Sequence, residues 1–315
     1  MKPLRLAGLA MMAGGLALPC LAMPSVALAE VLRVDGIYPA ASDQAAALRT
    51  IMVETIGGID GPGLGIRIED ALREVSLEGR PYFRILPRSE THRTDAVLRG
   101  TADSEVTFNR YTQEREECAT KDAGGKCTER RKVQVPCTRR KVELLIGLRL
   151  VAASGELLHA DNAPESLETS SCQGDDTAPR SRADIVRELS TRIASRLRFA
   201  FAPVFRSEAI RVNESRRGLS GGDAERFKQA VRLTKSDTAA ACREWDAITA
   251  ANPGHAPSLF NTALCAEAAG QDRLAGERYD RLQQLEPRSG EMREGLARLA
   301  ARDRARRQLE AHRRD

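Results

Sequence analysis

The chain has 315 residues, of which 42% are hydrophobic and 30% charged, and a formal net charge of +5. This is an ordinary globular composition, with enough apolar residues for one large domain or two average ones. Only 4% of the residues are aromatic, and basic and acidic residues are interspersed through most of the chain. Both features argue against a nucleic-acid-binding protein, which needs stacking platforms or a continuous basic surface.

The N-terminal residues have the pattern of an export signal. Two basic residues, Lys2 and Arg5, precede an apolar stretch that ends in the small-residue sequence Ala27-Leu28-Ala29. This order predicts a secretory signal peptide over residues 1–29. We therefore expect an exported, periplasmic protein.

Two alternatives are open for the same stretch. A retained membrane anchor needs an uninterrupted apolar run, and glycines and prolines break this one. Lipid anchoring at Cys20 needs a small residue directly before the cysteine, where this chain has Pro19. We expect neither, although the sequence leaves open whether the signal peptide is removed.

The elements expected between residues 30 and 205 alternate in type. Apolar residues at period two predict a strand over 31–38, and helical spacing predicts a helix from Ser42 to about Thr55. A glycine-rich loop and a second helix around 68–75 follow. Further strands are expected at 82–87, 96–100 with 106–108, 141–151 and 157–160, and a helix at 182–201.

This order predicts an α+β fold with a mixed or antiparallel sheet and flanking helices. Antiparallel hairpins with helices grouped around them are typical of this class, whereas a regular strand–helix alternation is typical of a parallel sheet. The strand end Ile85-Leu86-Pro87-Arg88 and the hairpin at Gly155 resemble those of a periplasmic domain. That domain is shared by the curli secretion lipoprotein, the penicillin-binding-protein activator lipoproteins and the N-terminal part of TolB. The chain lacks the long alternating apolar segments of the curli protein, so the resemblance implies no pore.

The glycine-rich loop 60–65 invites comparison with phosphate-binding loops. No Lys-Ser or Lys-Thr follows its last glycine, and we expect the loop between two helices rather than after a strand. Its glycines are expected to turn the chain.

A polar insertion over 109–140 carries three of the six cysteines that remain when Cys20 is left aside, and an even number of cysteines in an exported chain points to disulfides. Folding the insertion about the turn signal 122–125 is expected to place Cys118 directly opposite Cys127. Cys137 is then expected to pair with Cys172, which ties the polar loop 162–181 to the sheet. A zinc site is the alternative, but the cysteines lack the close spacing of zinc knuckles. No metal or cofactor is expected.

The C-terminal part contains two similar stretches, 241–253 and 275–287, in which an alanine, an aromatic residue and a proline recur at a period of 34. This spacing resembles the tetratricopeptide repeat, whose stacked helix pairs bind other proteins. The resemblance implies an all-α unit over 223–315, after a linker at 206–222. The residues expected to pack the repeats are Ala241, Trp245, Pro253, Ala263, Ala275, Tyr279 and Pro287.

Two further features belong to this unit. Cys242 and Cys265 fall on neighbouring helices, which predicts a disulfide, with two buried thiols as the alternative. The segment 291–314 is expected to cap the repeats through Met292, Leu296, Leu299 and Leu309 and to expose an arginine-rich face. That face is expected in solvent, with contact to an acidic partner or an anionic membrane as the alternative.

No constellation of histidine, serine or carboxylate residues has the spacing of a catalytic motif, so we expect no enzyme. The function expected is an exported scaffold or adaptor that binds a protein partner in cell-envelope assembly or maintenance. A periplasmic protein that binds a small molecule or a glycan is the alternative.

Overall fold

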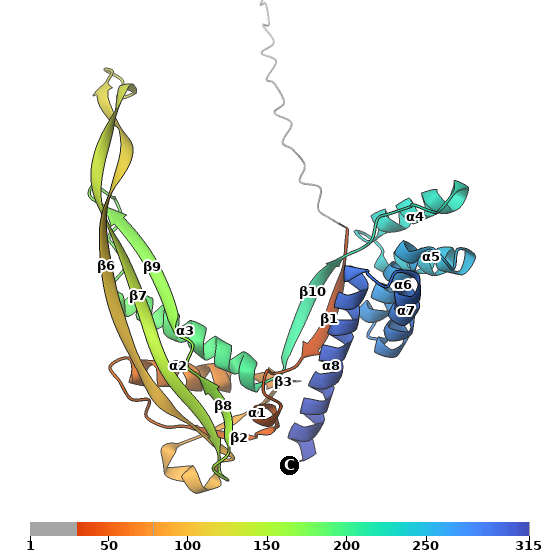
Figure 1. Ribbon diagram of the computed structural model, residues 1–315, viewed down its shortest axis with the longest axis horizontal. Helices are drawn as coiled ribbons and strands as arrows, with labels where there is room; N and C mark the ends of the chain where they lie inside the picture. Colours follow the sequence, from red (N-terminus) through yellow and green to blue (C-terminus); the bar gives the residue numbers. More distant parts are fainter. Residues whose placement is uncertain (1–29, 78, 315) are drawn as a thin grey trace, which may run out of the picture.

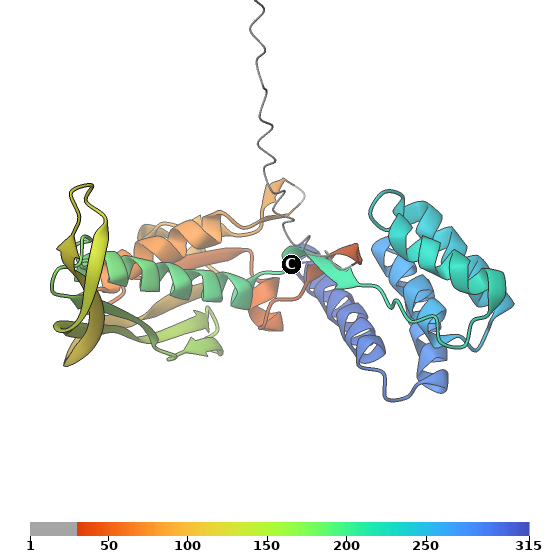
Figure 2. The same ribbon diagram turned by 90° about the horizontal axis from the view of Figure 1, so that it is seen from above.

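The computed structural model describes residues 30–77 and 79–314, so the predicted signal peptide and Cys20 lie outside the described residues. Figures 1 and 2 show an α+β domain and a group of C-terminal helices that meet around α1, β1 and α8. In this part of the chain, no helix combines the length and the apolar character that crossing a membrane requires.

The larger sheet of the α+β domain is mixed, as the sequence predicts. Its order is β5-β2-β6-β7-β8, and β9 pairs with β7 further along that strand. The pairs β2–β5 and β2–β6 are parallel, whereas β7 is antiparallel to β6, β8 and β9. The strands are β2 (Thr50–Val53), β5 (Arg84–Leu86), β6 (Ala96–Lys121), β7 (Cys127–Ala152), β8 (Leu157–Asp161) and β9 (Glu165–Cys172).

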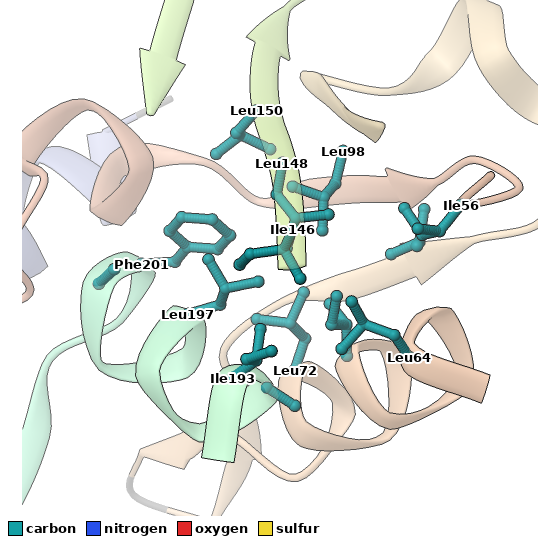
Figure 3. Packing of buried hydrophobic residues seen from close by; sticks show 14 of the residues in the cluster. Ile56, Leu64, Leu72, Leu98, Ile146, Leu148, Leu150, Ile193, Leu197 and Phe201 are labelled. Atoms are coloured by element: carbon teal, nitrogen blue, oxygen red, sulfur yellow. The ribbon is translucent and has the colours of Figure 1, made fainter. Parts of the chain in front are cut away.

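Two helices, α2 (Gly61–Arg73) and α3 (Arg182–Phe201), cover one face of this sheet and form its core (Figure 3). The helix α3 begins where Ser181 accepts a hydrogen bond from the backbone N–H of Asp184, an N-cap that satisfies one of the first free donors. Because side chains alternate along a strand, every second residue of β7 points into this core. These residues are Val142, Leu144, Ile146, Leu148 and Leu150.

The predicted helix from Ser42 to Thr55 is wrong in its second half. Helix α1 covers only Asp43–Ala47, and Thr50–Val53 forms the strand β2 between β5 and β6. All four residues of β2 are buried. A short apolar run that is buried on both faces has no period by which a strand can be told from a helix, so spacing alone misassigned it.

The expected glycine-rich loop 60–65 is not a loop, because residues 61–65 form the start of α2, and the strand β2 rather than a helix precedes them. Gly58 has a φ of +86°, and a Cβ on it would lie 2.3 Å from the carbonyl oxygen of Ala102. A Cβ on Gly61 would lie 2.3 Å from the carbonyl oxygen of Ile56. These glycines allow close backbone packing at the start of α2. The Asp60 carboxylate there accepts from Arg182 and from the backbone N–H of Ser104.

Two further segments expected as loop or linker contain strands. The polar loop 162–181 holds β9, which pairs with β7 from Cys172 to Glu165. The expected linker 206–222 begins inside β10 (Val204–Arg211), which pairs antiparallel with β1 (Val31–Tyr38) in a separate sheet. Both strands are polar on one side, so their partners, rather than their own hydrophobicity, define them.

The remaining short elements are β3 (Ser76–Leu77), β4 (Arg80–Pro81) and the 3₁₀ segment Arg88–Arg93. The C-terminal helices are α4 (Gly221–Leu233), α5 (Thr238–Ala251), α6 (Ala256–Ala268), α7 (Asp272–Leu285) and α8 (Gly290–Arg314). Helix α8 runs beside β1 and reaches α1, so it links the helical unit to the α+β domain (Figure 1).

Candidate functional site

The helices α4 to α7 form two antiparallel pairs around a second core. Ala241 and Trp245 on α5, Ala263 on α6, and Ala275 and Tyr279 on α7 are fully buried in it. Pro253 and Pro287 lie in the turns after α5 and α7 and are exposed, so they end helices rather than pack between them. The repeat period therefore marks core positions in its alanines and aromatic residues and helix ends in its prolines.

Ala275 is completely buried at a helix crossing, so its size is expected to matter. Replacing it with leucine should lower the free energy of unfolding by about 1–3 kcal/mol, because a closely packed crossing has no room for three more carbons. Urea unfolding followed by circular dichroism measures this. Leucine in place of the exposed Gln283 on the same helix is the control, and equal stability of both variants would contradict this packing.

A disulfide joins Cys242 on α5 to Cys265 on α6, the pair expected from the sequence. It crosslinks two neighbouring helices of the same core. The alternative of two free buried thiols is therefore not the arrangement found.

One face of helix α6 is covered by another segment of the same chain, around Asn213. The side-chain amide of Asn261 accepts from the backbone N–H of Asn213 at 2.8 Å and donates to the carbonyl oxygen of Asn213 at 2.9 Å. Leu32 and Val34 of β1 pack into the same helical core. Eleven of the thirteen residues of α6 are buried. The face of α6 beside Asn213 thus holds an internal segment.

A buried charge cluster joins α6, α7 and α8. The fully buried Glu267 accepts two hydrogen bonds from the guanidinium of Arg298, both at 2.8 Å, and one from the hydroxyl of Tyr279 at 2.8 Å. Arg302 lies 3.2 Å from the Glu267 carboxylate and 3.0 Å from that of Asp272. Because one carboxylate serves two guanidinium groups, this cluster fixes α8 against α6 and α7.

The protonation of this cluster follows from its surroundings. Burial, and then the charge of Glu267, raises the pKa of the Tyr279 hydroxyl, which therefore remains a donor. Burial alone would lower the pKa of Arg298, but the hydrogen bonds and charge of Glu267 outweigh it and raise that pKa. Arg298 therefore keeps its positive charge and Tyr279 its proton at neutral pH.

The arginine-rich face expected in solvent is corrected by this cluster. Arg298 and Arg302 are buried, and Arg304 pairs with Asp43 of α1 at 2.8 Å. Arg306 and Arg307 both pair with Asp303 on the same helix. Arg298 and Arg302 are therefore withdrawn from solvent, whereas the side chains of Arg306 and Arg307 are exposed. The hydrophobic pattern missed this because it counts arginine as an exposed residue.

The predicted insertion forms a projecting arm, which we define as residues 109–136 of the β6–β7 hairpin. Beyond Cys137, where β9 ends, the two strands of the arm have no further strand beside them among the described residues. From Glu116 to Lys132 every side chain except that of Cys127 is exposed. Figure 1 shows the arm extending away from the helices that cover the sheet.

Two disulfides staple this arm. Cys137 pairs with Cys172 at the base, where the two residues lie opposite each other in β7 and β9. Cys118 pairs with Cys127 near the tip, with the Cα atoms 5.7 Å apart. The prediction that Cys118 lies directly opposite Cys127 is wrong. Arg130 lies opposite Cys118, and the register shifts between Cys118 and Lys121. A bulge next to the turn changes the residue count in one strand.

The base of the arm is braced by the loop after β9. The Arg115 guanidinium lies 2.7 Å from the Asp175 carboxylate. The carbonyl oxygen of Pro136 accepts from the backbone N–H of Gln173. The backbone N–H of Cys172, and then Arg115, lowers the pKa of Asp175. The arm is therefore held at its base by a disulfide, an ion pair and backbone hydrogen bonds.

The described residues contain no group of three or more histidine, cysteine, aspartate or glutamate side chains that would hold a metal ion. The six cysteines of the described residues are in disulfides, so none of these six is a thiolate ligand. His255 is the N-cap of α6, where its Nδ1 accepts from the backbone N–H of Ser258. Sequence reasoning missed Asn261 and Glu267, because their partners are distant in the chain.

Comparisons with known proteins add little to this description. No family model and no curated protein matches the chain. Among solved structures, it is similar to the PelC dodecamer from Paraburkholderia phytofirmans, with 13% identity, a TM-score of 0.23, and coverage of 52% of this chain and 96% of that one.

A candidate lipoprotein from Caulobacter crescentus CB15 has 15% identity and a TM-score of 0.22, covering 50% of this chain and 92% of its own. A candidate neuraminyllactose-binding hemagglutinin homolog from Helicobacter pylori has 9% identity and a TM-score of 0.22, covering 48% and 79%. Likeness at this level indicates no function. The tetratricopeptide and curli-protein resemblances remain predictions.

The disulfides do bear on the compartment. Three disulfides connect all six cysteines of the described residues. Such bonds form and persist in oxidising compartments and are rare where cellular thiols are kept reduced. The chain is therefore an exported protein.

Proposed function

We propose that this chain is a non-enzymatic scaffold of the bacterial periplasm that binds a protein partner of the cell envelope, with the arm as its contact element. The stapled arm is the observation that carries this proposal. It adds almost nothing to the core, because its distal side chains are exposed, yet one disulfide crosslinks its tip and another its base.

A rigid projecting hairpin suits binding. Both of its edges offer unpaired backbone N–H and C=O groups, to which a strand of another protein can add. Stiffening by disulfides reduces the conformational entropy that is lost on binding. The mixed charges of the arm, including Glu114 paired with Lys132 at 2.8 Å, discourage association with unselected strands.

The helical unit supports the same function in a different way from the one expected. The proposed tetratricopeptide-like pairs hold β1 and Asn213 of the same chain, and α8 fixes them to the α+β domain. We therefore assign the helices the role of an internal frame and the arm the role of contact with the partner.

Shortening the arm tests the proposal. Glu116 and Lys132 lie opposite each other, so an Asn-Gly turn between them replaces residues 117–131 and keeps the base disulfide. This removes four basic and three acidic side chains, so the net charge changes by only one. We expect the shortened protein to keep its melting temperature but to lose the partner that the natural chain retains from crosslinked cell envelope.

The matched control exchanges the exposed ion pair of α7, Arg273→Glu with Glu277→Arg, and should retain the partner. Recovery of the same partner in the same amount by the shortened protein would refute the role of the arm.

A further inference from the structure

A second surface lies at one edge of the sheet, where β5 is the last strand. A groove with a volume of about 760 Å3 follows the start of β5. It lies between the end of α2, the beginning of β2 and the last turn of α8. It is lined by Arg49, Thr50, Arg73, residues 81–85 and His312.

The charged side chains that line this groove are basic. Among the described residues 30–77 and 79–314, its lining has three arginines and no carboxylate. Arg49 donates to the carbonyl oxygens of His312 at 3.1 Å and Arg313 at 3.0 Å, and no acidic side chain in the described part of the chain pairs with it. Arg73 pairs with Glu69 on α2.

Arg84 is the most available of the three. Its side chain is exposed and makes no hydrogen bond or ion pair with the described residues 30–77 and 79–314. An arginine without an internal partner, beside two others, attracts carboxylates, which it can hold with two parallel hydrogen bonds.

The floor of the groove is apolar and fixed. Tyr82 and Phe83 are buried, and the Tyr82 ring stacks on His312 with centroids 4.0 Å apart. The Tyr82 hydroxyl donates to the carbonyl oxygen of Ala46 at 2.6 Å. Burial lowers the pKa of His312, so its ring is neutral at pH 7 and adds no charge to the arginines. The groove thus combines an apolar floor with a basic rim.

One edge of β5 is unpaired in the described part of the chain. Among the described strands, β5 pairs only with β2. The N–H of Arg84 donates to the carbonyl oxygen of Arg49 at 2.8 Å, towards β2. Because backbone groups alternate in direction along a strand, the N–H and C=O of Ile85 point to the free edge. An added strand finds a donor and an acceptor there.

We propose that this groove binds an extended acidic segment of a partner protein, by strand addition to β5 with its carboxylates on Arg84 and Arg49. The charge selects acidic side chains, the open edge selects an extended backbone, and the apolar floor accepts the side chains between the acidic ones. This site is independent of the arm and gives a scaffold a second attachment point at the β5 edge of its sheet.

An array of octapeptides tests this proposal, with Glu or Asp at alternate positions and varied residues between them, beside a matched array with Lys. We expect saturable binding by members of the acidic array only. Arg84→Glu should weaken the best peptide at least tenfold in fluorescence anisotropy, whereas Arg273→Glu, at a side chain that is 90% exposed on α7, should not. Both variants must keep the natural melting temperature.

Methylation of alternate backbone nitrogens of the best peptide, in both registers, tests strand addition without a change in charge. We expect one register to lose at least tenfold in affinity. Equal binding of both methylated peptides, no preference for the acidic array, or unchanged binding by Arg84→Glu would each overturn the proposal. The arm-shortened protein should bind the peptide normally, so that the two proposals fail separately.

Discussion

Replacing Glu267 with glutamine is expected to lower the free energy of unfolding by about 3–5 kcal/mol. Glu267 is fully buried and is the common acceptor for Arg298, Arg302 and Tyr279. Without its charge, two guanidinium groups stay buried with only Asp272 as a carboxylate partner. Removing one partner of a buried ion pair costs far more than the pair itself contributes, because the remaining charge is desolvated and uncompensated.

Urea unfolding monitored by circular dichroism measures this loss. Glu277→Gln on α7 is the matched control, because Glu277 pairs with Arg273 in solvent and should contribute well under 1 kcal/mol. A loss below about 1 kcal/mol for Glu267→Gln would contradict the central place of this cluster in the helical unit.

The disulfide at the base of the arm is expected to have the second largest effect. Replacing both Cys137 and Cys172 with alanine should cost about 2–4 kcal/mol, because the bond closes a loop between residues 35 apart and ties β9 to the sheet. Replacing Cys118 and Cys127 removes a bond between residues 9 apart in the exposed part of the arm. This second change should leave the unfolding of the core almost unaltered.

The two double variants are each other's controls, compared in urea under oxidising conditions. Proteolysis adds a local measurement, and the variant without the Cys118–Cys127 bond should be cleaved faster within residues 117–131. Equal loss of stability in both variants would show that the whole arm unfolds with the core, contrary to its exposure.

The sequence predicted the parts of the fold whose residues recur at a clear period. Helix α3 and the hairpin of β7 and β8 lie where their apolar spacing placed them. The three cysteine pairs follow from an even cysteine number, a turn signal and neighbouring helices. In these segments the local pattern and the tertiary environment agree, which is why spacing sufficed.

Where the prediction failed, distant partners decide the structure. Segment 50–53 forms a strand because β5 and β6 flank it. Segment 204–211 forms a strand because it pairs with β1, which lies at the other end of this domain in the sequence. Arg298 and Arg302 are buried only because Glu267 on another helix compensates their charge. No local period contains this information.

The candidate surfaces were only partly visible in advance. The polar insertion marked the arm, because a segment with so few apolar residues cannot join a core. The groove at β5 could not be predicted, since Arg49, Arg73 and Arg84 come from three elements and His312 from the far end of the chain. Such a site exists only in the folded chain.

Because the C-terminal helices pack against the rest of the chain, their role in binding cannot be tested by deleting them. Deleting residues 220–315 would remove α8, which contacts both α1 and β1, and would expose Leu32 and Val34. Loss of binding after that deletion would therefore report on folding. Substitutions on the exposed surface separate binding from stability.

Site-specific photocrosslinking in intact cells tests the central claim most directly. A photoreactive residue at Glu117 or Thr128, both exposed on the arm, should give a crosslinked product of defined mass with one envelope protein. The same residue at the exposed Arg273 on α7 should not give this product. A product from the α7 position, with none from either arm position, would contradict the proposal that the arm contacts the partner.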